Sequence, residues 1–308
     1  MIMGKKMSSN EFVFSTGKRD IQTELAGYFF SIEPGERILS VRDLSAGLHV
    51  SVGAVSNILN SMQEEGFVRI EKRGRMGSFL IEQSLSRLYN LMNRGPIVIA
   101  MGLPMHRRFE GLATATKRLV ERMGIDLYFI FMRGAQARLQ ALHDNRCHAA
   151  LMSCLSAEAY MKRENEILFT LPETSWISEY GVFYRPSKRD ILRVGVDLRS
   201  YDHVYLTNNE FGDKVEQKSV SYIRLMQLLK NDEIDAIVWN KDQEEDLTNQ
   251  GIEYRPLSQC TEGKELLASF VGKKGNHVAA RVLSVMEDTE EFMRIQRQVV
   301  NGEIPPEY

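Results

Sequence analysis

Side chains between residues 42 and 75 could contact a nucleic acid in two ways, by charge and by hydrogen bonds to base edges. The cations are Arg42, Arg69, Lys72, Arg73 and Arg75. Arg42 is suited to hold a phosphate through two parallel hydrogen bonds. The others lie along an expected hairpin, which could follow a phosphate backbone or enter a minor groove. Because phosphate neutralisation supplies much of the affinity for DNA, these cations are its expected source.

The segment from Ser51 to Asn60 carries polar side chains but no cation. Its candidate base contacts are Ser51, Val52, Gly53, Ser56, Asn57 and Asn60. An asparagine can read an adenine edge, and an apolar side chain such as Val52 or Ala54 can touch a thymine methyl group. We therefore expect this segment to shift preference away from guanine and to lower affinity for non-specific DNA. For each polar side chain, plain solvated surface is the alternative interpretation.

A third group of polar residues and glycines follows the expected strands of the C-terminal part. The candidates for ligand contact are Gly102, Arg107, Arg133, Gly134, Ser153, Ser156, Asp197, Ser200, Ser221, Trp239 and Asn240. Several precede helices, whose free N–H groups suit a carboxylate or phosphate, and Arg107 and Arg133 could add a cation. Trp239 could form an apolar wall. The alternatives are helix-capping serines, a core tryptophan and a solvated Arg107.

The nucleic-acid candidates fall on elements that together predict a winged helix-turn-helix over residues 1–82. Helical spacing of apolar residues predicts a helix over residues 18–32, and capping serines predict two further helices over 40–46 and 51–65. After Gly66 the period becomes two, in "FVRIEK" and "SFLIE", which is typical of a hairpin.

Residues 83–95 predict a linker helix whose apolar face could pack on its own domain or on a second copy.

From residue 96 onward strands and helices alternate, which indicates a parallel sheet covered by helices. The segment "LQALHDNRCHAALMS" (139–153) aligns without gaps to "MQLLKNDEIDAIVWN" (226–240), so we expect two similar α/β lobes. The expected lobes are residues 96–178 with 260–308, and residues 186–255. Ligands of open α/β sheets bind beyond the carboxyl ends of the strands, here between the lobes.

The composition limits the classes of protein to consider. The chain has 308 residues, with 43% hydrophobic and 26% charged side chains, as in ordinary globular proteins. Its net charge of -2 gives no general attraction to DNA, so contact depends on the local placement of cations. The N-terminus lacks the apolar segment of a secretory signal, no apolar run reaches membrane-spanning length, and three cysteines fit a reducing compartment. We therefore expect a cytoplasmic protein with no membrane contact.

Motifs of catalysis and metal binding are weak in this sequence. It has no glycine-rich phosphate loop and no Gly-x-Ser-x-Gly segment, and no nucleophile with a local base stands out. His143, Cys147 and His148 are close in sequence, but the first is expected on a helix and the last at the start of a buried strand. These three side chains could therefore hardly bind the same metal ion. We expect no enzyme activity, no metal and no cofactor.

Residues 34–80 resemble the winged-helix domain of GntR-type transcription regulators. They carry in order Pro-Gly, Ser-Val-Arg-Asp-Leu, a Val-Ser helix start, Glu-Gly-Phe-Val and a Gly-x-x-Gly-Ser-Phe wing. Those regulators usually place arginines where this chain has Val52 and Ser56. The second part resembles a type II periplasmic-binding-protein fold, and the combination resembles the YhfZ family of GntR-like regulators. That resemblance implies a cytoplasmic DNA-binding protein with a ligand-sensing type of C-terminal domain, and it implies no particular ligand.

Taken together, these features predict an α/β protein that regulates transcription in response to a small metabolite. A homodimer would place two winged helices on half-sites of double-stranded DNA about one helical turn apart, or a multiple of that distance. Three alternatives stay open. The two-lobed part could be an enzyme, the C-terminal part could serve dimerisation alone in a constitutive DNA-binding protein, or the winged helix could mediate protein contacts.

Overall fold

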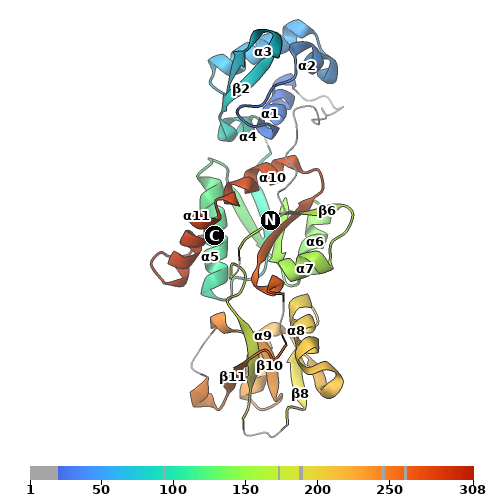
Figure 1. Cartoon of the computed structure of the whole chain (residues 1–308), viewed down its shortest axis with the longest axis vertical. Coiled ribbons are helices and arrows are strands. Elements are labelled where there is room, and N and C mark those ends of the chain that lie inside the picture. The colour runs from blue at the N-terminus through green and yellow to red at the C-terminus, as the bar shows by residue number, and fades with distance from the viewer. Residues whose placement is uncertain (1–19, 93, 173, 187–189, 244–246, 260–261) are drawn as a thin grey trace. The chain divides into compact units, whose positions relative to one another are not determined.

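The computed structural model describes residues 20–92, 94–172, 174–186, 190–243, 247–259 and 262–308. The first 19 residues of the expected DNA-binding domain, Asn93 of the expected linker helix and Cys260 lie outside the described residues. Contacts divide the chain into a smaller unit of residues 1–97, 118–127 and 275–285 and a larger unit of residues 98–117, 128–274 and 286–308 (Figure 1). Among the described residues, no helix combines the length and apolar character that crossing a bilayer requires.

The smaller unit contains the predicted winged helix-turn-helix. Its elements are α1 (Ile21–Ser31), α2 (Val41–Leu48), α3 (Val52–Glu64), β1 (Val68–Lys72) and β2 (Ser78–Gln83). The predicted caps are present, because the Ser40 hydroxyl accepts the backbone N–H of Asp43 and the Ser51 hydroxyl accepts that of Ala54. A short 3-10 turn over Gly74–Met76 connects the antiparallel strands, and Gly77 follows it at φ 95°. That backbone conformation favours glycine.

Aromatic and aliphatic side chains of α1 form the centre of this unit. Tyr28, Phe29 and Phe30 are fully buried, and α3 buries Val55 and Met62. On α3 the buried residues Val55, Leu59 and Met62 recur at helical spacing, which gives that helix one face for the core.

Two further helices belong to the smaller unit, as do the last residues of α5 (Arg107–Glu121) from Arg118 onward. The expected linker helix is α4 (Leu85–Leu91), and it packs on α1 of its own unit, where the ring centroid of Tyr89 lies 5.8 Å from that of Phe30. The helix α10 (His277–Leu283) also packs on α1, and Arg281 Nη1 donates to Glu33 Oε1 over 2.8 Å. The sequence had placed the helices after residue 276 on the first lobe; α10 has its contacts in the smaller unit, whereas α11 (Thr289–Val300) belongs to the larger one.

The larger unit contains two five-stranded sheets, one for each predicted lobe. The first lobe has strands β3 (Ile97–Met101), β4 (Leu127–Phe131), β5 (Ala149–Ser153), β6 (Asn165–Thr170) and β12 (Ala268–Lys273), with helices α5 (Arg107–Glu121), α6 (Ala135–His143) and α7 (Cys154–Ala159). The second lobe has strands β7 (Tyr180–Tyr184), β8 (Arg193–Val196), β9 (Glu216–Ser219), β10 (Ala236–Asn240) and β11 (Glu253–Pro256), with helices α8 (Tyr201–Phe211) and α9 (Tyr222–Lys230).

The two sheets have the same topology. Written from corresponding edges, their strand orders are β4-β3-β5-β12-β6 and β9-β8-β10-β7-β11. In each lobe the strand that crosses from the other lobe, β12 or β7, is antiparallel to both of its neighbours. The sheets are therefore mixed, and the expectation of a purely parallel sheet is wrong at this one strand per lobe. The predicted repeat corresponds to α6–β5 and α9–β10, which confirms a two-lobed fold of the type II periplasmic-binding-protein kind.

Candidate functional site

The exposed face of α3 carries the residues that were predicted to meet bases. Val52, Gly53, Asn57 and Asn60 are exposed and Ser56 is half-buried, while the opposite face is buried. Ser51 is exposed at the helix start, but its hydroxyl already accepts a backbone N–H. Within the described residues no cation stands on this helix, so its surface offers amides and one large apolar side chain, Val52, which is 48% exposed.

The cations of the wing divide into paired and unpaired ones. Arg69 forms an ion pair with Glu82 across the hairpin, and Arg73 pairs with Glu71 over 3.0 Å. Each acid cancels the positive charge next to it, so these pairs present little net charge to a phosphate. Lys72 and Arg75 are exposed and have no ion-pair partner among the described residues.

Arg73 is also held by an aromatic ring. Its guanidinium carbon lies 4.6 Å from the ring centroid of Phe79, a cation–π contact that fixes the side chain along the strand. Arg73 is therefore positioned by two neighbours on the hairpin, whereas Lys72 and Arg75 are free to follow a phosphate.

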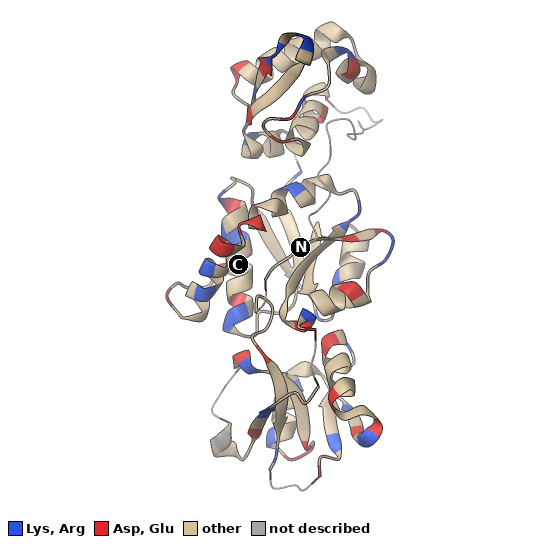
Figure 2. Ribbon diagram, in the orientation of Figure 1, with Lys and Arg blue, Asp and Glu red and all other residues tan. Residues whose placement is uncertain are grey.

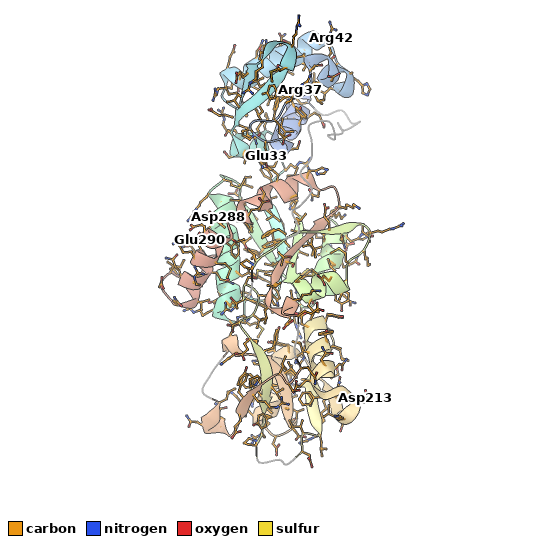
Figure 3. The ribbon with its side chains drawn as sticks, viewed as in Figure 1. Glu33, Arg37, Arg42, Asp213, Asp288 and Glu290 are labelled. Atoms are coloured by element: carbon orange, nitrogen blue, oxygen red, sulfur yellow. The ribbon has the colours of Figure 1, made fainter. Side chains whose placement is uncertain are left out.

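Two residues near the wing were missed by the sequence analysis. Arg37 is exposed and its backbone bridges to the second strand at Phe79, and its guanidinium lies beside Gly77, at the turn of the wing. Met76, at the tip, is 63% exposed, and apolar side chains at such tips can wedge into a minor groove. Arg42 is exposed on α2 without an ion-pair partner in the described part of the chain (Figure 3). Figure 2 shows the cations of α2 and of the hairpin toward the same end of the smaller unit.

In the larger unit, a cavity of about 140 Å³ lies where the strands of both lobes end. Seven of the eleven predicted ligand contacts line it: Gly102, Arg133, Gly134, Ser153, Ser156, Asp197 and Ser200. Arg107, Ser221, Trp239 and Asn240 do not line it. Arg107 is exposed on α5 beside Glu110, at 3.3 Å. Trp239 stacks behind Tyr222, with 4.1 Å between ring centroids, and Tyr222 itself faces the cavity.

An ion pair joins the two lobes at one side of the cavity. Arg133 follows β4 of the first lobe, and its Nη2 donates to Asp197 Oδ2, which follows β8 of the second lobe, over 2.6 Å. Asp197 also accepts the backbone N–H groups of Tyr222 and Arg199. Burial alone would raise the pKa of Asp197, but these N–H groups and Arg133 lower it overall. Asp197 is therefore an ionised carboxylate whose hydrogen-bonding capacity is already used by the chain.

A second polar cluster lies on another side of the cavity. Asp202 of α8 is only 6% exposed, and its Oδ1 accepts the hydroxyls of Ser153 and Ser156, each over 2.7 Å. Arg138 of α6 is also 6% exposed, and its Nη1 donates to the carbonyl oxygen of Met132 over 2.9 Å. Burial lowers the pKa of Arg138 to about 10 and raises that of Asp202, and each charge acts on the other in the opposite direction.

The remaining wall of the cavity is aromatic. The rings of His106 and Phe109 lie 4.2 Å apart and those of Phe109 and Trp176 lie 4.4 Å apart, centroid to centroid. Burial lowers the pKa of His106 to about 4, so the imidazole is neutral at pH 7. Its Nδ1 is buried without a hydrogen-bond partner among the described residues. This wall can accept a flat or aliphatic group and offers it one imidazole nitrogen.

Arg138 and Asp202 were not among the ligand contacts predicted from the sequence. Arg138 stands at a buried position of α6, with Ala135 three residues before it and Leu142 four residues after it, and a charge on an apolar face is the signal that could have found it. Asp202 follows a capping serine and reads as an ordinary first-turn acid. The described residues contain no cluster of three or more His, Cys, Asp or Glu that could hold a metal ion.

Comparison with known proteins adds to this geometry. Residues 85–308 match the family model described as the YhfZ C-terminal domain, and residues 33–80 match a helix-turn-helix domain. A protein of Escherichia coli (strain K12) named YhfZ is 31% identical over 295 residues, covering 93% of this chain and 96% of that protein. The crystal structure of YhfZ from Shigella flexneri is similar with a TM-score of 0.62 and 30% identity, over 72% of this chain and 97% of the other.

Proposed function

Because this chain belongs to the YhfZ family, we propose that it is a sequence-specific DNA-binding transcription regulator controlled by a small metabolite in the cavity between its C-terminal lobes. A helix-turn-helix domain and a ligand-binding type of domain occur together in it. The observation that carries the proposal is the polar cavity, which is lined by buried charged side chains from both lobes. A domain that served dimerisation alone would have no need to bury charges there.

On DNA, the two parts of the winged helix have separate roles in this proposal. The unpaired cations Arg42, Lys72 and Arg75 contact phosphates and set the affinity. Asn57 and Asn60 of α3 contact base edges and set the sequence, with Val52 against a thymine methyl group. Two copies of the chain would bind two half-sites, as paired winged helices do, and contact with the chromosome would place the protein in the cytoplasm.

In this proposal, the effect of the bound ligand reaches the smaller unit along the chain, through β12 and α10. Ser153 ends β5, and β5 pairs along its length with β12, where Ala268 stands opposite Ser153. Directly after β12 the chain enters α10, which packs on α1 in the smaller unit. A ligand that changes the position of β5 and β12 would act on α1 through α10. The ligand must bind the two forms of the protein with different affinity, because only that difference shifts the balance between them.

The DNA-reading part can be tested by selecting binding sites from a random duplex library with the full chain. We expect an enriched motif with two half-sites, in which A·T pairs stand at the positions that α3 contacts. The double variant Asn57→Ala/Asn60→Ala should relax the motif at those positions and leave binding to bulk DNA nearly unchanged. Asn90→Ala is the matched control, because Asn90 is an exposed amide of α4, a helix other than α3.

Two results would refute the DNA-reading part. One is a selection from which no motif emerges, which would favour a winged helix that contacts proteins. The other is a motif that survives in the Asn57→Ala/Asn60→Ala variant with unchanged base preferences. The sensing part is tested separately by native mass spectrometry of the freshly purified chain, where a retained small molecule is expected. A bound molecule that is converted to a product on incubation would support the enzyme alternative instead.

A further inference from the structure

Among the described residues of its own lobe, no acid forms an ion pair with the buried guanidinium of Arg138. Its Nη1 has one carbonyl acceptor, and its Nε is buried with no hydrogen-bond partner among the described residues. The carboxylate whose charge acts on Arg138 is that of Asp202, which belongs to the other lobe. Since a buried cation is costly unless it is paired, the first lobe by itself presents a site that requires an anion.

Two hydroxyl groups complete this anion-binding cluster in the first lobe. Ser153 ends β5 and Ser156 lies in the first turn of α7, and both hydroxyls are buried and donate to the same oxygen of Asp202. Ser153 and Ser156 therefore donate to one carboxylate and the charge of Arg138 acts on it, and we call these three residues the carboxylate cluster. Charge-assisted hydrogen bonds of this kind are stronger than neutral ones.

Asp202 fills the carboxylate cluster from across the cleft. It stands in the first turn of α8, a helix of the second lobe, and no described residue of its own lobe donates a side-chain hydrogen bond to it. Its contacts are thus those of a bound ligand rather than those of a residue that serves its own lobe. Two other polar links cross between the lobes, Arg133 with Asp197 and Arg108 with Asp242 at 2.8 Å, so loss of Asp202 from the cluster would leave the lobes connected.

We propose that Asp202 occupies the place of an effector carboxylate, and that the effector is a small carboxylic acid whose anionic group displaces Asp202 from Ser153 and Ser156 and takes its place near the charge of Arg138. This inference rests on the proposed function, since it names the ligand class and the switch of the same cavity. The rest of the effector lies against Phe109 and Trp176 of the aromatic wall. A cavity of roughly 150 Å³ can hold benzene, so the 140 Å³ found here suits a compact apolar group.

The regulation follows from competition between two carboxylates. Without effector, Asp202 links the lobes through the serines; with effector, that link is lost, while the ion pairs Arg133 with Asp197 and Arg108 with Asp242 still join the lobes. An effector can bind only those molecules in which Asp202 has left the cluster. Its observed dissociation constant is therefore the intrinsic one divided by the fraction of such molecules. The chain therefore sets its own threshold for the effector by the strength of the Asp202 contact.

The test replaces Asp202 and supplies a carboxylate from solution. In Asp202→Ala the cluster has lost its occupant, and we expect sodium acetate to raise the melting temperature of the full chain more than acetamide does at equal concentration and ionic strength. Sodium benzoate, which adds an apolar ring, should bind this variant at least about tenfold more tightly than the wild type, because its competitor is gone. Asp202→Asn keeps the shape of the side chain and should give a change in the same direction.

Two controls connect the effect with the cluster. Asp213→Ala removes an exposed acid of the second lobe (Figure 3) and should leave benzoate affinity at the wild-type value. The triple variant Ser153→Ala/Ser156→Ala/Asp202→Ala should lose the response to acetate. Benzoate affinity that is unchanged or weaker in both Asp202 variants would overturn the proposal, as would a response to acetate that persists without the serines. These binding measurements use no DNA, so failure of the DNA-binding proposal would be visible on its own in the site selection.

Discussion

Removal of the unpaired wing cations should lower both the affinity for DNA and its dependence on salt. The double variant Lys72→Ala/Arg75→Ala deletes two exposed positive charges that have no acidic partner among the described residues. Since neither side chain is part of the core of the smaller unit, folding should be unaffected, and any change can be attributed to lost phosphate contacts.

The magnitude follows from counterion release. Each neutralised phosphate contributes about 0.9 to the slope of the logarithm of the binding constant against the logarithm of salt concentration. If Lys72 and Arg75 contact one phosphate each, the slope should fall by about 1.8. When salt is raised from 50 to 200 mM, the factor by which binding weakens should then be about 12 times smaller for the double variant than for the wild type.

The assay is fluorescence anisotropy of a labelled duplex of mixed sequence, titrated with the full chain over a series of salt concentrations. No operator is needed, because the phosphate contribution does not depend on sequence. The matched control is Arg69→Ala/Glu82→Ala, which removes an ion pair of zero net charge from the same hairpin. We expect a slope within experimental error of the wild type for this control.

The reasoning would be wrong if Lys72→Ala/Arg75→Ala left the slope at its wild-type value. It would also be wrong if the neutral pair Arg69 with Glu82 contributed as much as the two unpaired cations. In the second case Arg69 would have to leave Glu82 on binding DNA, and the division of the wing into paired and unpaired cations would have no bearing on affinity.

Three further predictions concern stability. His203 is buried, and burial lowers its pKa to about 4 from its ordinary value of 6.5. The stability that its neutral form provides, about 3 kcal/mol, is therefore present above pH 6.5 and is lost as the pH falls toward 4. His203→Gln should make the free energy of urea unfolding less dependent on pH in that window. Tyr28→Phe deletes the hydroxyl that accepts a backbone N–H over 2.7 Å, and should lower the free energy of unfolding by about 1–3 kcal/mol. Gly77→Ala should cost at least about 1 kcal/mol, because a Cβ at φ 95° would lie 2.7 Å from Arg37 Nε, whereas Gly53→Ala in open space on α3 should gain about 0.4–1 kcal/mol; equal effects of the two glycine variants in urea unfolding would contradict this.

The element types could be predicted because their signals are local. A serine followed by a helical stripe predicts a capped helix, and both Ser40 and Ser51 cap helices in the structure. The partners of those elements could not be predicted in the same way. The apolar face of α4 fits its own unit or a second copy equally well, and only the packing on α1 decides between them. The antiparallel direction of β7 and β12 depends on where the chain crosses between lobes, which no local pattern records.

The candidate site was predictable where the topology alone determines position. Ser153 and Asp197 line the cavity because each stands at the end of a strand, and strand ends of one lobe meet at one edge. Asn240 also ends a strand, but its amide donates to the hydroxyl of Tyr222, so the predicted ligand group supports the wall instead. Arg138 and Asp202 lie within helices, and their meeting depends on the approach of two lobes.

The packing of α10 on α1 has a consequence for the order in which the chain is completed on the ribosome. About 190 residues separate the end of the 1–97 segment of the smaller unit from the end of its 275–285 segment. At about 5–20 residues per second, their synthesis takes roughly 10–40 s. During that interval the strands of both sheets emerge, while α1 still lacks one of its neighbours. A nascent chain therefore holds most of the larger unit before the unit that contains the winged helix-turn-helix has all of its segments.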